Sequence, residues 1–175
     1  MRSFSATFRN ELEASSSEEH ILVLLKISDS SGLAPARVVS DTVDYLYDDG
    51  AGEQRYVGFP FVIELLSDDG RPPRGRLTIQ NVDARIGARV RLLTEAPSMI
   101  LTVLASADFG AATGDPKTRS AIGTPAIEYQ ALHLALRNIK VDAMAVSADI
   151  VSYDYTSEPW PAIRSTPNLL PGLAP

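Results

Sequence analysis

The sequence predicts a mainly β domain, a barrel or a sandwich, with an N-terminal helix, one further short packed helix and an extended, proline-rich C-terminal arm. About eight segments have the apolar patterns of strands, whereas only two have helical spacing. Five of the twelve prolines lie in the last eighteen residues, where they exclude both a helix and a central strand. We therefore expect a body of residues 1–157 and an arm of residues 158–175.

The composition is that of a soluble globular protein. The 175 residues are 45% hydrophobic and 22% charged, enough for one domain with a core. The net charge of −6 argues against binding nucleic acid by neutralising its phosphates, and the absence of cysteine excludes disulfides and thiolate metal sites. Neither a signal peptide nor a membrane-spanning helix is predicted, so we expect synthesis in the cytosol.

The body begins with a helix and a buried strand. Phe4, Phe8 and Leu12 recur at every fourth position of residues 4–14, which predicts one apolar face on a short helix. Residues 21–27 are apolar at nearly every position, which predicts a strand buried on both faces. Two further strands are expected at residues 36–40 and 43–47, before the hairpin signal of residues 48–52.

Residues 55–65 show the clearest strand alternation. Large apolar side chains share one face, while Tyr56 and Val62 lie on the other. Pro60 predicts a sheet edge or a bulge. The apolar face consists of Val57, Phe59, Phe61, Ile63 and Leu65.

The second half contains one expected helix and one irregular stretch. Residues 84–93 have a helical apolar stripe of Ile86, Val90 and Leu93. Residues 108–124 are rich in Gly, Ala and Thr and are predicted to be a flexible loop. Strands are expected at residues 74–79, 98–106, 127–136 (with Leu132, Leu134 and Leu136 on one face) and, after a turn beginning at Asn138, at residues 140–153.

No catalytic, cofactor-binding or metal site is predicted. His20 and His133 are the two histidines, and both are interpreted as ordinary residues of the strand framework; no nucleophile-elbow, phosphate-loop, dinucleotide or zinc-protease motif occurs. The acidic stretch 48–53 lacks the spacing of a calcium loop and is interpreted as a turn. A hydrolase that uses Asp41 and Asp44 as paired acids is a rival hypothesis.

Three features are candidates for binding partners. Tyr45, Tyr47 and Tyr56 would suit a glycan-binding module if they were exposed, although strand packing is the favoured interpretation. The arginines of residues 71–91 predict either a solvated face or a contact with an acidic neighbour. The arm carries large apolar side chains that a disordered tail would lack, so we expect it to dock on its own body or on a neighbouring subunit. Its expected anchors are Trp160, Pro161, Ile163, Leu169, Leu170 and Leu173.

The closing sequence is the most distinctive part of the chain. Residues 158–167 read Glu-Pro-Trp-Pro-Ala-Ile-Arg-Ser-Thr-Pro, and residues 170–173 read Leu-Pro-Gly-Leu. With the segments 21–25, 37–41, 59–65, 74–83 and 137–139, they resemble a family of short tail-tip or baseplate proteins of long-tailed, siphovirus-type phages and prophages. The resemblance covers nearly the whole chain.

This resemblance implies a virion structural protein similar to the N-terminal hub domain of lambda tail tip protein L, a β-barrel related to the tail-tube fold. It implies a homo-oligomeric ring, a trimer in preference to a hexamer, around the DNA channel between the distal tail tube and the central fibre. DNA would pass through without specific binding, and neither an enzyme activity nor a cofactor is implied. A hexameric distal-tail ring of the same fold is one alternative, and a module that binds a host-surface glycan is another.

Overall fold

The structure, a computed structural model, describes residues 5–14, 16, 19–29, 32, 34–64, 74–80, 95–112 and 115–152. The helix predicted at residues 84–93 and the arm at residues 158–175, with the boundary after residue 157, lie outside the described residues. The described part is mainly β, as the sequence predicts, with one α-helix, α1 (Ala6–Glu13), and one 3-10 turn, η1 (Ser106–Asp108).

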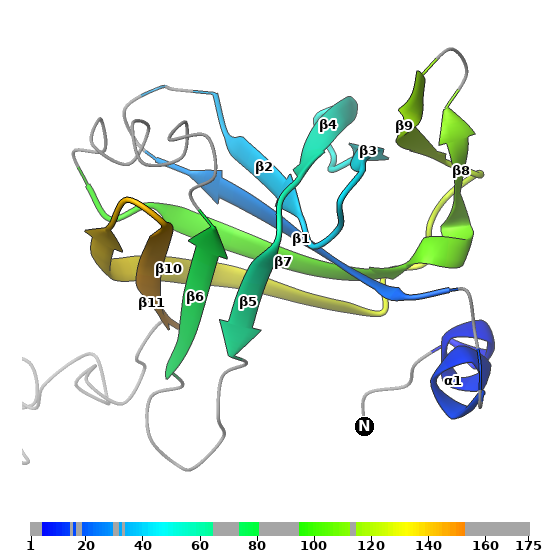
Figure 1. Cartoon of the computed structure of the whole chain (residues 1–175), viewed down its shortest axis with the longest axis horizontal. Helices are drawn as coiled ribbons and strands as arrows, with labels where there is room; N and C mark the ends of the chain where they lie inside the picture. Colours follow the sequence, from blue (N-terminus) through cyan, green and yellow to red (C-terminus); the bar gives the residue numbers. More distant parts are fainter. Residues whose placement is uncertain are drawn as a thin grey trace, which may run out of the picture.

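The strands form one 11-stranded mixed sheet in the order β5-β6-β11-β10-β7-β1-β2-β4-β3-β9-β8 (Figure 1). Their bounds are β1 (Ile21–Ser28), β2 (Ala36–Val39), β3 (Asp44–Asp48), β4 (Glu53–Gly58), β5 (Phe61–Glu64), β6 (Arg74–Gln80), β7 (Ser98–Ala105), β8 (Phe109–Ala112), β9 (Asp115–Ala121), β10 (Tyr129–Val141) and β11 (Ala145–Val151). The strands predicted at residues 21–27, 36–40, 43–47, 74–79 and 98–106 are confirmed.

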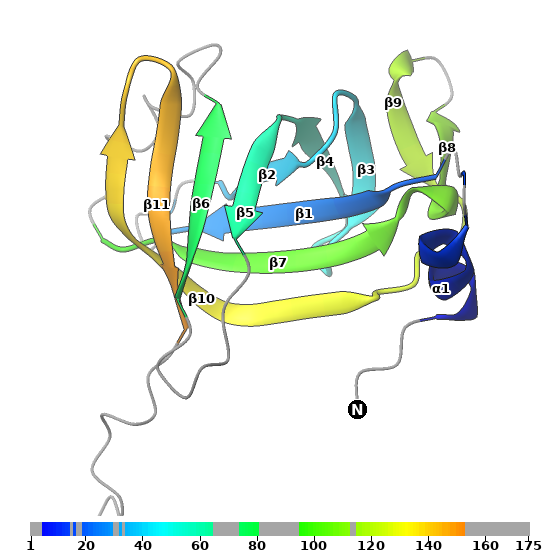
Figure 2. The same ribbon diagram turned by 60° about the horizontal axis from the view of Figure 1, so that its bottom comes forward.

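One bent segment closes a barrel. β4 pairs with β2 in parallel up to Gly58, and the Phe59 N–H donates to the Val39 carbonyl at 3.0 Å. After Pro60 the chain continues as β5 and pairs with β6 (Figure 2), so the ring β1-β2-β4/β5-β6-β11-β10-β7 returns to β1. The single strand predicted at residues 55–65 is therefore split at its proline, where it changes partner.

Apolar side chains fill the interior of this barrel. Its closing segment contributes Phe59, Phe61 and Ile63, all from the face predicted to be apolar. Each large aliphatic side chain that is fully buried stabilises the fold by roughly 1.5–3 kcal/mol. The buried members are Leu25, Val38, Leu77, Ile79, Met99, Leu101, Leu134, Leu136, Ala148 and Ile150.

A second layer covers one outer side of the barrel. β4 also pairs with β3, β3 pairs in parallel with β9, and β9 pairs with β8. β1 lies between the two layers, which explains its continuous apolar sequence and confirms the prediction of a strand buried on both faces. The residues between the second layer and the barrel form what we call the outer core: Leu22, Leu24, Val39, Tyr45, Tyr47, Tyr56, Leu104 and Phe109.

Two irregularities shape the long strand β10. His133 and Asn138 have positive φ values of 59° and 52°, and the pairing register shifts beside each of them. Leu134 and Leu136 are buried as predicted, but the first bulge moves Leu132 off their face, and Leu132 is 48% exposed. Asn138 does not begin a turn, because the strand continues through it to the end of β10.

Two other predictions are wrong. Residues 108–124 are not an irregular loop but contain β8 and β9, because β9 pairs in parallel with β3 even though its small and polar side chains show no apolar period. The strand predicted at residues 140–153 is interrupted by a turn, closed by a hydrogen bond from the Asp142 N–H to the Ala145 carbonyl at 2.9 Å. β11 begins only at Ala145.

The N-terminal helix α1 is capped and anchored. The Ser5 hydroxyl accepts a hydrogen bond from the Phe8 N–H at 3.1 Å, as an N-cap does, and the Ser5 N–H donates to Glu128 at 2.8 Å. Phe8 is 4% exposed, but Leu12, predicted on the same buried face, is 54% exposed. Phe4 lies outside the described residues.

Candidate functional site

The predicted arm anchors all lie outside the described residues. They are Trp160, Pro161, Ile163, Leu169, Leu170 and Leu173. Of the arginines in residues 71–91, Arg76 is the one whose side chain is described, and it is exposed on β6. Among the described residues, the second layer carries the candidate features. These are a group of charged side chains around Asp41, Asp44 and Asp49 and an open sheet edge at β8.

The three tyrosines considered as a glycan platform are buried. Tyr45, Tyr47 and Tyr56 are 3%, 8% and 2% exposed. Tyr45 meets Phe109 edge-on with ring centroids 5.1 Å apart, and Tyr47 meets Tyr56 in the same manner at 6.0 Å. Aromatic pairs of this geometry stabilise a core beyond the burial of their area. Strand packing, the favoured interpretation, is confirmed for these three side chains.

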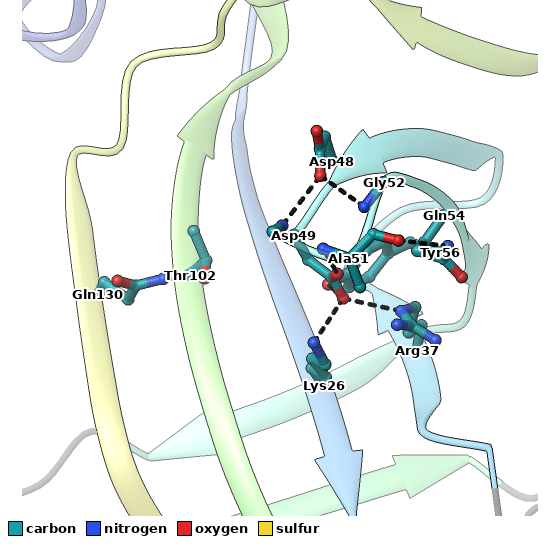
Figure 3. Close-up of polar contacts among 11 residues, drawn as sticks. Lys26, Arg37, Asp48, Asp49, Ala51, Gly52, Gln54, Tyr56, Thr102 and Gln130 are labelled. Carbon is teal, nitrogen blue, oxygen red and sulfur yellow. Dashed lines mark hydrogen bonds and ion pairs between the residues drawn. The ribbon is translucent and has the colours of Figure 1, made fainter.

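A buried ion cluster closes one end of the outer core (Figure 3). The Asp49 side chain, 6% exposed, places Oδ2 3.0 Å from Lys26 Nζ of β1 and 2.9 Å from Arg37 Nε of β2. The Tyr56 hydroxyl donates to the same oxygen at 3.2 Å. The cluster therefore ties the β3–β4 hairpin to the two barrel strands beneath it.

The charges in this cluster depend on one another. Lys26 and Arg37 lie directly opposite each other in the β1–β2 pair, where two like charges repel. Burial opposes the ionisation of Asp49, but its hydrogen bonds and ion pairs with Arg37 and Lys26 outweigh burial and hold its pKa below the ordinary value. Burial and the neighbouring Asp49 charge raise the pKa of Tyr56, so this tyrosine stays a hydrogen-bond donor.

Asp41 and Asp44, the rival paired acids, both make structural contacts. The Asp41 carboxylate accepts hydrogen bonds from the Tyr45 hydroxyl at 2.6 Å and from the Thr42 N–H at 2.5 Å. Burial opposes its ionisation, but these hydrogen bonds outweigh burial and hold the pKa of Asp41 below the ordinary value, the reverse of what a general acid needs. Asp44 lies 2.6 Å from the guanidinium of Arg55. These contacts give the hydrolase hypothesis no support.

The acidic turn after β3 is bound by its own backbone. Asp48 Oδ1 accepts hydrogen bonds from the Gly50 N–H at 2.9 Å and the Gly52 N–H at 3.0 Å. Both glycines have positive φ, which this tight hairpin requires. The interpretation of this stretch as a turn is confirmed. Within the residues that the structure describes, no group of three or more His, Asp or Glu side chains is placed to hold a metal ion.

The two histidines belong to the strand framework. His133 is exposed at the bulge of β10, as expected for a solvent-facing strand residue. The side chain of His20 is 50% exposed, and its Nε2 lies 3.1 Å from Asp41 Oδ2, just before β1.

An open sheet edge is the feature that the sequence reasoning missed. β8 is the last strand in the sheet order, and within the described residues it pairs with β9 alone. Ile122, which is 68% exposed, leans over Gly110 of this strand. The sequence of β8, Phe-Gly-Ala-Ala, shows no strand period, and its one local signal is a short uncharged segment that follows the turn η1.

Comparison with known protein families identifies a matching family model. A model described as a domain of unknown function (DUF1833) matches residues 7–165, a range that includes every strand in the described part of the chain and the first part of the predicted arm. A search of curated proteins finds no match. In the described part of the chain, no helix has both the length and the apolar character needed to cross a membrane.

Proposed function

We propose that this chain, which belongs to the DUF1833 family, is a non-catalytic structural subunit of a phage tail tip or baseplate. In this role, identical copies form a ring, a trimer, around the DNA channel between the distal tail tube and the central fibre of the virion. DNA passes through the ring without specific binding, which a net charge of −6 favours because the protein repels phosphates.

One observation carries the proposal: a filled barrel bears a second layer that ends in an open, uncharged strand edge. Copies that assemble into a ring need surfaces that pair with the next copy, and an exposed strand edge offers backbone hydrogen bonds for this purpose. Because side chains fill the barrel, the channel of such a ring lies between copies and not through a barrel.

The sequence resemblance supports the same role. Its most specific segment, the closing sequence of residues 158–167, lies largely within the range of the family match, which ends at residue 165. The family domain thus continues beyond β11, as expected if the arm serves assembly in the whole family.

Deletion of the gene from the phage or prophage that carries it tests the proposal. Electron microscopy is expected to show particles whose tails lack the tip, with infectivity lost, and a plasmid copy is expected to restore both. Infectious particles with complete tails in the absence of the protein would contradict the proposed function.

The number of copies in the ring distinguishes two hypotheses, a trimeric tail-tip hub and a hexameric distal-tail ring of the same fold. Light scattering on the purified full chain is expected to give the mass of a trimer. A hexamer would favour the distal-tail position instead. No described contact favours a glycan-binding module, since the tyrosines considered for it are buried.

A further inference from the structure

The two ends of the strand order differ in how they are protected. β5, at one end, follows Pro60 and finishes at Glu64, and both a proline and a charge discourage the addition of a strand. β8, at the other end, contains neither a charge nor a proline, and Gly110 and Ala111 contribute no side chain larger than a methyl group. β8 is therefore the better acceptor for an added strand.

An exposed apolar side chain lies next to this edge. Ile122 leans over β8, because a Cβ on Gly110 would stand 3.1 Å from Ile122 Cδ1. Asp108 fixes the segment that carries Ile122 and Ile127: its carbonyl accepts the Ile122 N–H at 2.8 Å, and its carboxylate accepts the Ala126 N–H at 3.0 Å. Ile122, 68% exposed, is thus held in place over the open edge strand, and Ile127, 51% exposed, follows in the segment that Asp108 fixes.

The arm has the sequence of a strand that pairs along one side only. Its five prolines stand at positions 159, 161, 167, 171 and 175, all of them odd. Successive residues of an extended strand direct their N–H groups to opposite sides, so every missing N–H falls on the same side and the other side keeps all its donors. Residues 162–166, Ala-Ile-Arg-Ser-Thr, are the longest stretch of the arm without proline and suffice to pair with the four residues of β8.

The positions of the arm, which would supply the added strand, and of β8, which would receive it, favour pairing between copies. β11, which precedes the arm, pairs with β6 and β10, and both views of the molecule place it at the opposite end from β8 (Figures 1 and 2). The nine residues 153–161 that precede the pairing segment span about 28 Å if extended at roughly 3.1 Å per residue, enough to reach an adjoining copy. If the arm at one end of each copy pairs with β8 at the other end of the next copy, the copies contact one another head to tail. Contacts of this kind can close into a ring.

We propose that residues 162–166 of one copy add as an edge strand to β8 of the next copy, with Ile163 packing on Ile122. This inference rests on the proposed ring assembly and specifies the contact that builds it. Main-chain hydrogen bonds supply the affinity and the isoleucines supply the apolar contact, as in other cases of strand addition.

Engineered cysteines test this contact cleanly, because the chain has none of its own. Full-length Ala111→Cys and Arg164→Cys chains, carrying different tags, are co-expressed and treated with a short bis-maleimide crosslinker. The expected result is a crosslinked dimer that contains both tags. Met144→Cys, on the turn between β10 and β11 and 84% exposed, replaces Ala111→Cys in the control and is expected to give no dimer with Arg164→Cys.

Light scattering on the same samples separates the two proposals. A ring of defined mass without the Ala111–Arg164 crosslink would overturn the strand addition but leave the ring assembly standing. A crosslink within one chain, in a variant that carries both cysteines, would also overturn it, since the arm would then close its own sheet. A monomer at every concentration would overturn both proposals.

Discussion

The barrel interior and the outer core are built from different kinds of side chain. The buried residues of the barrel interior are all apolar, whereas the outer core includes tyrosines that bind carboxylates. The Tyr45 hydroxyl donates to the partly buried Asp41, and the Tyr56 hydroxyl, Lys26 and Arg37 all contact Asp49. Apolar burial does not change with pH, but ion pairs and charged hydrogen bonds do. We therefore expect the barrel to supply most of the stability, and the second layer to be attached by contacts that depend on charge.

Truncating a leucine of the barrel interior is expected to have the largest effect. Leu25 is 0% exposed, so Leu25→Ala removes its contacts and leaves a cavity, and the free energy of unfolding falls by about 4 kcal/mol. Urea unfolding measures this loss. Val62→Ala, at a position 68% exposed, is the control and is expected to change the stability by less than about 0.5 kcal/mol. Equal losses in the two variants would argue against a packed interior.

Neutralising Asp49 is expected to have the next largest effect. Asp49→Asn leaves Lys26 and Arg37 opposite each other without their counter-ion, so the free energy of unfolding falls by about 3 kcal/mol. Glu53→Gln, which removes an exposed carboxylate from the same hairpin, is expected to leave the midpoint of urea unfolding nearly unchanged. A stable Asp49→Asn protein would show that the cluster does not hold the hairpin.

Two tyrosines of the outer core can be compared by removing the hydroxyl of each and measuring the loss of stability. Tyr45→Phe loses the hydrogen bond to the Asp41 carboxylate and is expected to cost about 1.5 kcal/mol. Tyr47→Phe is the matched control, since within the described part of the chain its hydroxyl makes no hydrogen bond, and a smaller loss is expected. Thermal unfolding of both variants measures the difference; a larger loss at Tyr47 would contradict this account.

The effect of pH on the free energy of unfolding is expected to be the smallest. It should involve the ion cluster of the outer core and leave the barrel interior unaffected. The pKa of Asp49 is lowered from its ordinary value of 3.8, so the ionised carboxylate stabilises the fold above about pH 4, and this contribution is lost as the pH falls below that value. The difference in unfolding free energy between wild type and Asp49→Asn should become smaller from pH 6 to pH 3. The difference between wild type and Leu25→Ala should stay constant over the same range. If both differences became smaller together, the two cores would not differ in their dependence on charge.

Local patterns predicted much of the fold because several strands carry their own signal. Residues 21–27 are apolar on both faces, and the structure places β1 between two cores. Asp48 and the two glycines after it encode the turn that their hydrogen bonds make. In these places the residue types alone determine the backbone or the burial.

Other parts depend on contacts that are distant in sequence. β8 and β9 contain small or polar residues without a period, and β9 is fixed by parallel pairing with β3. The bulge at Asn138 has a weak local signal, since asparagine tolerates positive φ, but its amide also donates to Asp149 on the neighbouring strand at 2.8 Å. The open edge of β8 follows from the order of the strands, which no local pattern contains.

The measurement that tests the central claim most directly is the mass in solution of the full chain and of a chain that ends at Asp154. The account predicts a trimer for the full chain and a folded monomer for the shorter chain, with similar circular dichroism for both. A full chain that stays monomeric at all concentrations, or a shorter chain that keeps the mass of the ring, would contradict assembly through the arm.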